Sequence, residues 1–240
     1  VVNPYVLSTV TERKEVEAEL EAVVEDAATR VREAGVDVQT TVEAGFPHEE
    51  ILNAVEDVGI DLVAMGTHGR SGLQRYVIGS VAEKTVRLSP VPVLTVRTDA
   101  TGTRPYDDVV VPTDGSDAAA PAERWGVDLA GQSDAVVHAL SVVPKARIRS
   151  SETVEAQEEA ARKAVDRVVA LGDSAGVRVS DTIEHGVPHR VILDYCEDTD
   201  ADLVVLGTHG RTGVERFVLG SVAEKVVRLS ETPVLVVPTR

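Results

Sequence analysis

Short apolar runs alternate with longer amphipathic stretches along the second half of the chain. Continuous apolar runs are typical of strands buried on both faces of a sheet, and apolar residues three or four positions apart are typical of helices. The predicted strands cover residues 108–112, 135–143, 177–184, 201–206 and 233–237. The predicted helices cover residues 118–130, 151–174, 188–197 and 221–229. This alternation predicts an α/β fold of parallel βα units in a doubly wound sheet.

The same pattern occurs twice, at an offset of 141 positions. The segment that begins at Asp61 (DLVAMGTHGR) recurs at Asp202 (DLVVLGTHGR), and the segment GSVAEK at Gly79 recurs at Gly220. Such internal similarity at a constant offset indicates two homologous units. We place them at residues 1–99 and 106–240, separated by a polar stretch rich in Thr, Gly and Pro that reads as a linker.

The first unit is incomplete. Residues 106–141 of the second unit have no counterpart, so the first unit lacks the first strand, the first helix and most of the second strand. From the end of the second strand onward, its elements are expected to match those of the second unit. We favour a truncated chain or a misassigned gene start. The alternatives are a degenerate unit that leans on the second one, and a partner chain that supplies the missing strands.

Composition narrows the class of protein. The 40 Asp and Glu residues outnumber 24 Lys and Arg, which gives a net charge of −16. This balance disfavours nucleic acid and anionic membranes as partners, because both require clustered cations. The excess of acidic residues favours a protein that works in a cytoplasm of high salt concentration. The single cysteine, Cys196, rules out an intrachain disulfide framework and is expected to be packed in a core. With no long apolar segment and no signal-peptide pattern at the start, we expect a cytoplasmic location.

Glycines mark the candidate site. The predicted strand 201–206 is followed by Gly207-Thr-His-Gly210, and Gly220-Ser221 opens a helix nine residues later. Glycines allow backbone N–H groups to approach a phosphate closely, and a helix N-terminus attracts anions. Open α/β sheets bind ligands at the carboxyl ends of their strands. The spacing therefore predicts a phosphate-binding loop, with Ser221 either donating to a phosphate or capping its own helix.

A second turn is expected to face this loop. Val111-Pro-Thr-Asp114-Gly-Ser116 follows the first strand of the second unit. If that strand neighbours the fourth, Asp114 lies beside the glycine loop, where an acidic side chain suits ribose hydroxyls or the edge of adenine. The alternative role for Asp114 is that of a helix N-cap.

At these residues the sequence resembles the universal stress protein family, and in particular its ATP-binding branch, which is marked by Gly-x2-Gly-x9-Gly-(Ser/Thr). The resemblance implies a five-stranded parallel sheet of order 3-2-1-4-5 in each unit, with helices on both faces. It implies contacts to adenine and ribose from Pro112, Thr113, Asp114 and Val142. It implies a phosphate side formed by Leu206, Gly207, His209, Gly210, Gly220, Ser221 and Val222. The matching positions of the first unit are Val1, Met65, Gly66, His68, Gly69, Gly79, Ser80 and Val81.

The resemblance also implies that units pair through their last strands. In a tandem chain we expect antiparallel contact between residues 92–94 and 233–237, and a homodimer through the same strands is the alternative. Arg211 either reaches a phosphate or lies on the surface. For His209 we favour backbone contact near phosphate over metal ligation or catalysis, since no second ligand stands at the required spacing.

These features predict a nucleotide-binding regulatory or stress-response protein. The expected ligand is ATP, with or without Mg²⁺, and any turnover is expected to be slow, because neither a GxxxxGK[ST] motif nor an obvious metal-binding acidic cluster is present. One alternative is a dimerisation module that binds no nucleotide. The other is an ATP-dependent adenylating enzyme of related fold, whose Ser-Gly-Gly-x-Asp-Ser loop is replaced here by residues 112–116.

Overall fold

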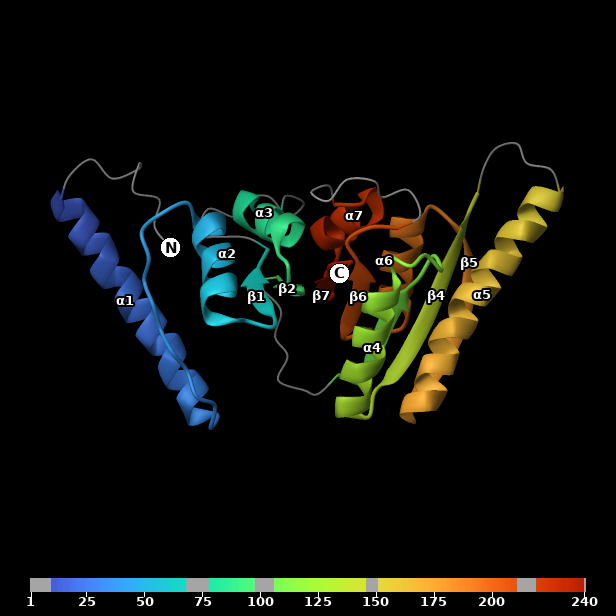
Figure 1. Cartoon of the computed structure of the whole chain (residues 1–240), viewed down its shortest axis with the longest axis horizontal. Coiled ribbons are helices and arrows are strands. Elements are labelled where there is room, and N and C mark those ends of the chain that lie inside the picture. The colour runs from blue at the N-terminus through green and yellow to red at the C-terminus, as the bar shows by residue number, and fades with distance from the viewer. Residues whose placement is uncertain (1–9, 68–77, 98–105, 146–150, 211–218, 240) are drawn as a thin grey trace. The chain divides into compact units, whose positions relative to one another are not determined.

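The structure is a computed structural model that describes residues 10–67, 78–97, 106–145, 151–210 and 219–239 (Figure 1). The chain divides into two compact units, Val1–Gly59 and Ile60–Arg240. The described part of the smaller unit contains helices α1 (Val10–Glu33) and α2 (Pro47–Val58). The predicted linker between the two sequence repeats lies largely outside the described residues.

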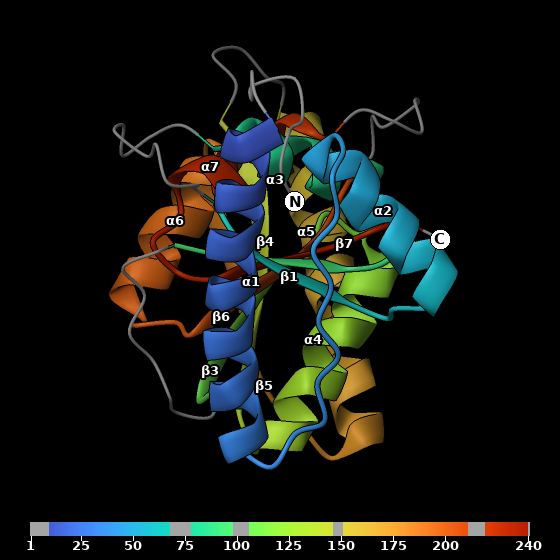
Figure 2. The ribbon, with the colours of Figure 1, turned by 90° about the vertical axis from the view of Figure 1, so that its left-hand side faces the viewer.

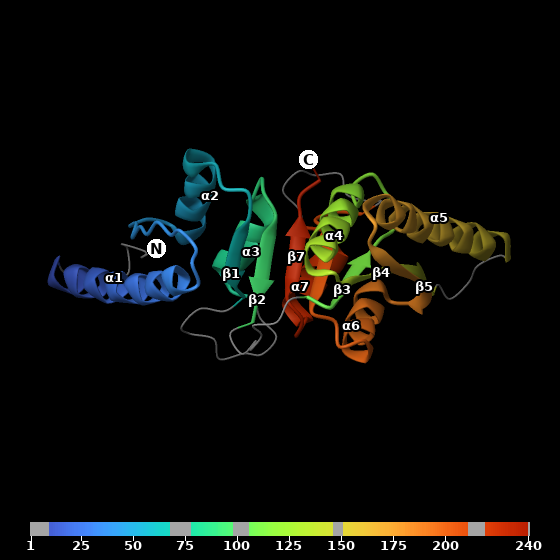
Figure 3. The ribbon, with the colours of Figure 1, turned by 90° about the horizontal axis from the view of Figure 1, so that it is seen from below.

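A seven-stranded sheet forms the centre of the larger unit (Figure 3). Its strands are β1 (Val63–Gly66), β2 (Val93–Val96), β3 (Asp108–Pro112), β4 (Val136–Pro144), β5 (Arg178–Gly186), β6 (Leu203–Gly207) and β7 (Val234–Val237). Its helices are α3 (Ser80–Leu88), α4 (Ala120–Ser133), α5 (Ser151–Ala175), α6 (Pro188–Asp198) and α7 (Ser221–Leu229). The spatial order of the strands is β1-β2-β7-β6-β3-β4-β5.

The second repeat has the predicted doubly wound topology. Its five strands, β3 to β7, follow the order 3-2-1-4-5, and every neighbouring pair among them is parallel. Strands β4 and β5 lie on one side of β3, and β6 and β7 lie on the other. The strand order therefore reverses between β3 and β6. A crevice at the carboxyl ends of the strands is expected at this switch point.

The last strands of the two repeats pair with each other, as predicted. Strand β2 runs antiparallel to β7, with Val93 opposite Val236 and Thr95 opposite Val234. The hydroxyl of Thr95 also donates a hydrogen bond of 3.1 Å to the carbonyl oxygen of Val234. Each repeat thereby covers the strand edge that the other would leave open.

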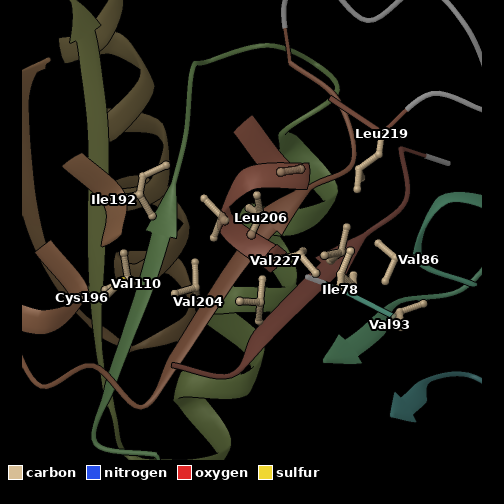
Figure 4. Packing of buried hydrophobic residues seen from close by; sticks show 14 of the residues in the cluster. Ile78, Val86, Val93, Val110, Ile192, Cys196, Val204, Leu206, Leu219 and Val227 are labelled. Atoms are coloured by element: carbon tan, nitrogen blue, oxygen red, sulfur yellow. The ribbon is translucent and has the colours of Figure 1, made fainter. Parts of the chain in front are cut away.

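Helices cover both faces of the sheet. Figure 2 shows α6 and α7 on one side of the strands and α4 on the other. Val109 and Val111 pack toward α4 and α5, whereas Val110 packs toward α6 and α7. Figure 4 shows Val110, Val204 and Leu206 on that second face, near Ile192 and Cys196 of α6. This two-sided burial explains why the strands read as unbroken apolar runs.

Cys196 is a packing residue, as predicted. It is 3% exposed, and burial raises the pKa of its thiol to about 12. The sulfur therefore stays protonated at neutral pH, and a protonated thiol is a poor nucleophile.

One predicted strand of the first repeat does not form. Residues 36–43, which match β5 of the second repeat, have no strand structure in the first unit. In the second repeat β5 pairs along its whole length with β4, from Val136–Arg178 to Pro144–Gly186. The expectation that the first repeat matches from the end of its second strand onward holds for α1, α2, β1, α3 and β2 and was wrong for this strand alone. A strand needs a neighbour for its backbone hydrogen bonds, and no strand of the described residues lies beside residues 36–43.

Candidate functional site

A cavity of about 320 Å³ opens at the carboxyl ends of β3, β4 and β6. It lies at the switch point of the sheet, where open α/β folds bind ligands, and its volume is within the range of small-molecule sites. The structure brings eleven of the predicted site residues to this cavity: Pro112, Thr113, Asp114, Val142, Leu206, Gly207, His209, Gly210, Gly220, Ser221 and Val222. Arg211 lies outside the described residues.

The glycine loop and the start of α7 form one end of the cavity. The amide of Thr208 donates to the carbonyl oxygen of Val237 (3.0 Å), and the amide of Gly220 donates to that of Thr208 (2.8 Å). These two bonds fix the helix start beside the strand end. The amide of Gly220 is therefore already hydrogen-bonded within the protein, and Gly220 contributes to the site by shaping the loop. No side chain caps α7, and the N–H groups of Ser221, Val222 and Ala223 precede the first intrahelical bond, which runs from Glu224 to the carbonyl oxygen of Gly220 (2.9 Å).

The predicted capping roles are not observed. The N-cap position of α7 is Gly220, and the hydroxyl of Ser221 makes no capping bond. Helix α4 begins at Ala120, two residues later than predicted, and its N-cap is Ala119. The carboxylate of Asp114 instead accepts hydrogen bonds from the amide (3.0 Å) and hydroxyl (2.6 Å) of Ser116. Asp114 therefore closes its own turn rather than a helix.

Asp114 lies directly against the glycine loop, as predicted. A Cβ atom added to Gly210 would stand 2.5 Å from Oδ2 of Asp114, so only glycine fits at this position without a shift of the carboxylate. The cavity thus combines two kinds of hydrogen-bonding group. Backbone N–H groups bind anions, and the carboxylate of Asp114 accepts hydrogen bonds.

A buried ion pair holds the Asp114 turn in place. The side chain of Glu123 in α4 is 1% exposed, and the guanidinium of Arg167 in α5 donates to both of its carboxylate oxygens. Thr113 donates its hydroxyl proton to the same carboxylate (2.5 Å). Arg167 also donates to the carbonyl oxygens of Gly115 (3.3 Å) and Ser116 (3.1 Å). The hydrogen bond to Glu123 is the main cause of the raised pKa of Arg167.

Glycine is required in this turn. Gly115 has a φ of +76°, and an added Cβ would come within 3.1 Å of Cβ of Ala164 in α5. The left-handed conformation allows the chain to reverse between β3 and α4 while α5 packs closely on the turn. Helices α4 and α5 therefore fix the position of Asp114 from two sides.

Two buried polar atoms at the cavity lack protein partners. Nε2 of His209 and Oε1 of Gln157 are inaccessible to solvent and find no hydrogen-bond partner among the described residues. The other ring nitrogen of His209 is 3.0 Å from the hydroxyl of Thr208. Unpaired buried polar atoms are uncommon in folded proteins, and a bound ligand is one way to satisfy them.

Sequence reasoning missed Glu123, Arg167 and Gln157. A weak signal exists for Glu123, because it stands next to Ala122 and one helical turn before Val127, on the apolar side of its helix. Gln157 likewise continues a stripe of small and apolar residues through Ala161 and Val165. Nothing local marks Arg167, because its partners are 44 or more positions away in the chain.

The described residues of the first repeat contain the strand end and the helix start of this arrangement. Met65 and Gly66 end β1, and Gly79, Ser80 and Val81 surround the start of α3. The amide of Thr67 donates to Val96 (3.0 Å) and that of Gly79 to Thr67 (2.7 Å), which repeats the anchoring seen in the second repeat. Val1, His68 and Gly69 lie outside the described residues.

The described residues offer few groups for catalysis. Asp114 is the only carboxylate that lines the cavity within the described part of the chain. A search of those same residues finds no group of three or more His, Cys, Asp and Glu side chains placed to hold a metal ion. None of the helices described is both long and apolar enough to cross a membrane.

His189 is expected to make the fold sensitive to acid. Burial lowers its pKa below the ordinary 6.5, and the nearby cations Lys225, Arg190 and Arg228 lower it further. The unfolded chain therefore binds a proton more readily than the folded chain, so stability is lost as the pH falls below about 6.5. We expect His189→Gln to lose less free energy of unfolding than the wild type between pH 7.5 and pH 5.5, as measured by urea denaturation. Equal losses would contradict this assignment.

Known proteins resemble this chain in sequence and in fold. A universal stress protein of Methanocaldococcus jannaschii is 37% identical over 139 residues, which is 55% of this chain and 82% of the relative. A putative universal stress protein of Staphylococcus saprophyticus is 36% identical and covers 56% of this chain and 84% of the relative. The crystal structure of an Archaeoglobus fulgidus universal stress protein is 27% identical, with a TM-score of 0.71, over 97% of this chain and 80% of that chain.

The family match is present in both repeats. The sequence profile described as "Universal stress protein family" matches residues 3–97 and again residues 105–238. The two matches together span most of the chain, and the fold as a whole is similar to that of the solved relative. The chain belongs to the universal stress protein family, with two copies of its domain in tandem.

Proposed function

We propose that the cavity of the second repeat binds ATP, and that the chain is a nucleotide-dependent regulatory protein. The observation that carries this proposal is the juxtaposition of Asp114 and Gly210, which puts a hydrogen-bond acceptor against a loop of phosphate-binding type. A nucleotide has the complementary arrangement, with anionic phosphates at one end and hydroxyl and amino donors at the other. The apolar residues Val142 and Leu206 also line the cavity and suit a flat base.

The groups expected to hold the phosphates are mainly backbone amides. The helix α7 directs its N-terminus toward the cavity, and the first residues of the helix, Ser221 and Val222, line it. Such an end carries a positive partial charge and free N–H donors. Nε2 of His209 has no hydrogen-bond partner within the described part of the chain, and a turn of the ring would offer it to a phosphate or ribose oxygen.

The residues that line the cavity suit the binding of a nucleotide better than its rapid hydrolysis. Rapid phosphoryl transfer needs a positioned nucleophile, charge neutralisation around the transferred group and an in-line geometry. Among the described lining residues only Asp114 is charged, and its carboxylate is already bonded to Ser116. We therefore propose that ligand occupancy, rather than a reaction product, is the signal.

ATP is expected to stabilise the folded protein. A ligand that binds only the folded state at 100 times its Kd raises the free energy of unfolding by about 2.7 kcal/mol. The measurement is chemical denaturation with and without ATP and Mg²⁺ at matched ionic strength, with inorganic triphosphate as the control for simple anion effects. An unchanged midpoint in a well-folded sample would favour a module that binds no nucleotide.

A further inference from the structure

Gln157 presents a buried hydrogen-bond acceptor that the fold does not use. Its side chain lines the cavity from the first part of α5, and its Oε1 atom is shielded from solvent without a partner among the described residues. It occupies the cavity side of the helix, because Ala161, one turn later, also lines the cavity, and Val165 is fully buried. An amide oxygen that is buried and unpaired is unfavourable, so a rotation of the side chain that brings Oε1 to a donor on a bound ligand is favoured.

The position of Gln157 favours contact with the base rather than with the phosphates. Helix α5 packs on β4 and β5, and the end of β4, from Val142 to Pro144, forms the neighbouring wall of the cavity. Pro188 and Ile192 of α6 line it as well. These apolar side chains surround the part of the cavity that suits a planar ring, whereas the amides for phosphate belong to β6 and α7.

We infer that Gln157 accepts a hydrogen bond from the exocyclic amino group of the bound base and thereby selects a 6-amino purine over a 6-oxo purine. This inference rests on the proposed function and adds a specificity determinant to it. A 6-amino group donates to Oε1, whereas a 6-oxo group would put a second acceptor against it. The amide oxygen thus discriminates between two bases of nearly identical shape.

The test compares ATP with ITP, whose bases differ at the 6-position, by calorimetric titration of the full chain. The wild type is expected to bind ATP at least about fivefold more tightly than ITP, the difference that one neutral hydrogen bond provides. Gln157→Met keeps the length of the side chain but removes the acceptor, so it should bring the two Kd values together by weakening ATP. Gln157→Glu retains an acceptor oxygen and should keep the preference for ATP. Glu155→Gln, at an exposed position of the same helix, is the matched control.

The outcomes distinguish the role of Gln157 from the proposed binding of a nucleotide. A wild type that binds ATP and ITP equally, or prefers ITP, overturns the role of Gln157 while leaving nucleotide binding intact. So does a Gln157→Met variant that keeps the wild-type ratio of Kd values. A wild type that binds neither nucleotide overturns the proposed function and this inference together. Thermal unfolding of each variant without ligand verifies that changes in the ratio do not come from misfolding.

Discussion

Gly210→Val is expected to weaken ATP binding by at least about 100-fold, equivalent to about 2.7 kcal/mol. A Cβ atom at this position would stand 2.5 Å from Oδ2 of Asp114, so a valine side chain would displace the carboxylate and obstruct the cavity beside it. We place the sugar and the first phosphates in this part of the cavity. The measurement is calorimetric titration with ATP.

The fold itself should tolerate this substitution. Gly210 is not among the glycines with positive φ, so valine introduces no left-handed strain. The matched control is Gly69→Val, at the same position of the motif in the first repeat, which lacks an Asp-bearing turn. That variant should bind ATP like the wild type. Unchanged affinity in Gly210→Val would mean that the ligand does not lie beside Gly210 and Asp114.

Arg167→Met is expected to destabilise the protein by about 3 kcal/mol, because it leaves the carboxylate of Glu123 buried without a cationic partner. The substitution also removes the two hydrogen bonds that fix the carbonyl groups of Gly115 and Ser116. ATP affinity should fall as well, since Asp114 lies within that turn. Urea denaturation and titration with ATP measure the two effects.

A second ion pair on the same helix provides the control. Arg162 pairs with Asp181 at 2.6 Å, but both side chains are about half exposed, and such surface pairs contribute at most about 1 kcal/mol. Arg162→Met should therefore have little effect. Adding Glu123→Gln to Arg167→Met should recover part of the lost stability, because it removes the unpaired charge. If Arg167→Met were as stable as Arg162→Met, the turn would not depend on this pair.

The sequence carried strong signals for the elements of the second repeat. The boundaries of β3 and α7 were predicted correctly, because a buried strand is a continuous apolar run and α7 follows a glycine. The antiparallel contact of the last strands was also predicted, from the family resemblance and the apolar edge that each repeat would otherwise expose. These features depend on neighbouring residues or on the repeat itself.

The features that the sequence did not predict depend on contacts between residues that are far apart in the chain. Residues 36–43 have the composition of a strand but form none, because no strand of the described residues lies beside them, and their own composition does not show whether a neighbour exists. Similarly, the glycine loop and Asp114 were visible as motifs, whereas Arg167 and Glu123 meet only because α4 and α5 pack side by side. Charged residues on an otherwise solvated helix look alike until the fold shows which one is buried.

The most direct test of the central claim is a crystal structure of the full chain grown with excess ATP. We expect the phosphates to accept hydrogen bonds from backbone amides of the glycine loop that ends at Gly210 and of the first turn of α7, with Asp114 at the ribose or the base. A nucleotide bound elsewhere, or a cavity that stays empty at saturating ATP, would contradict this account.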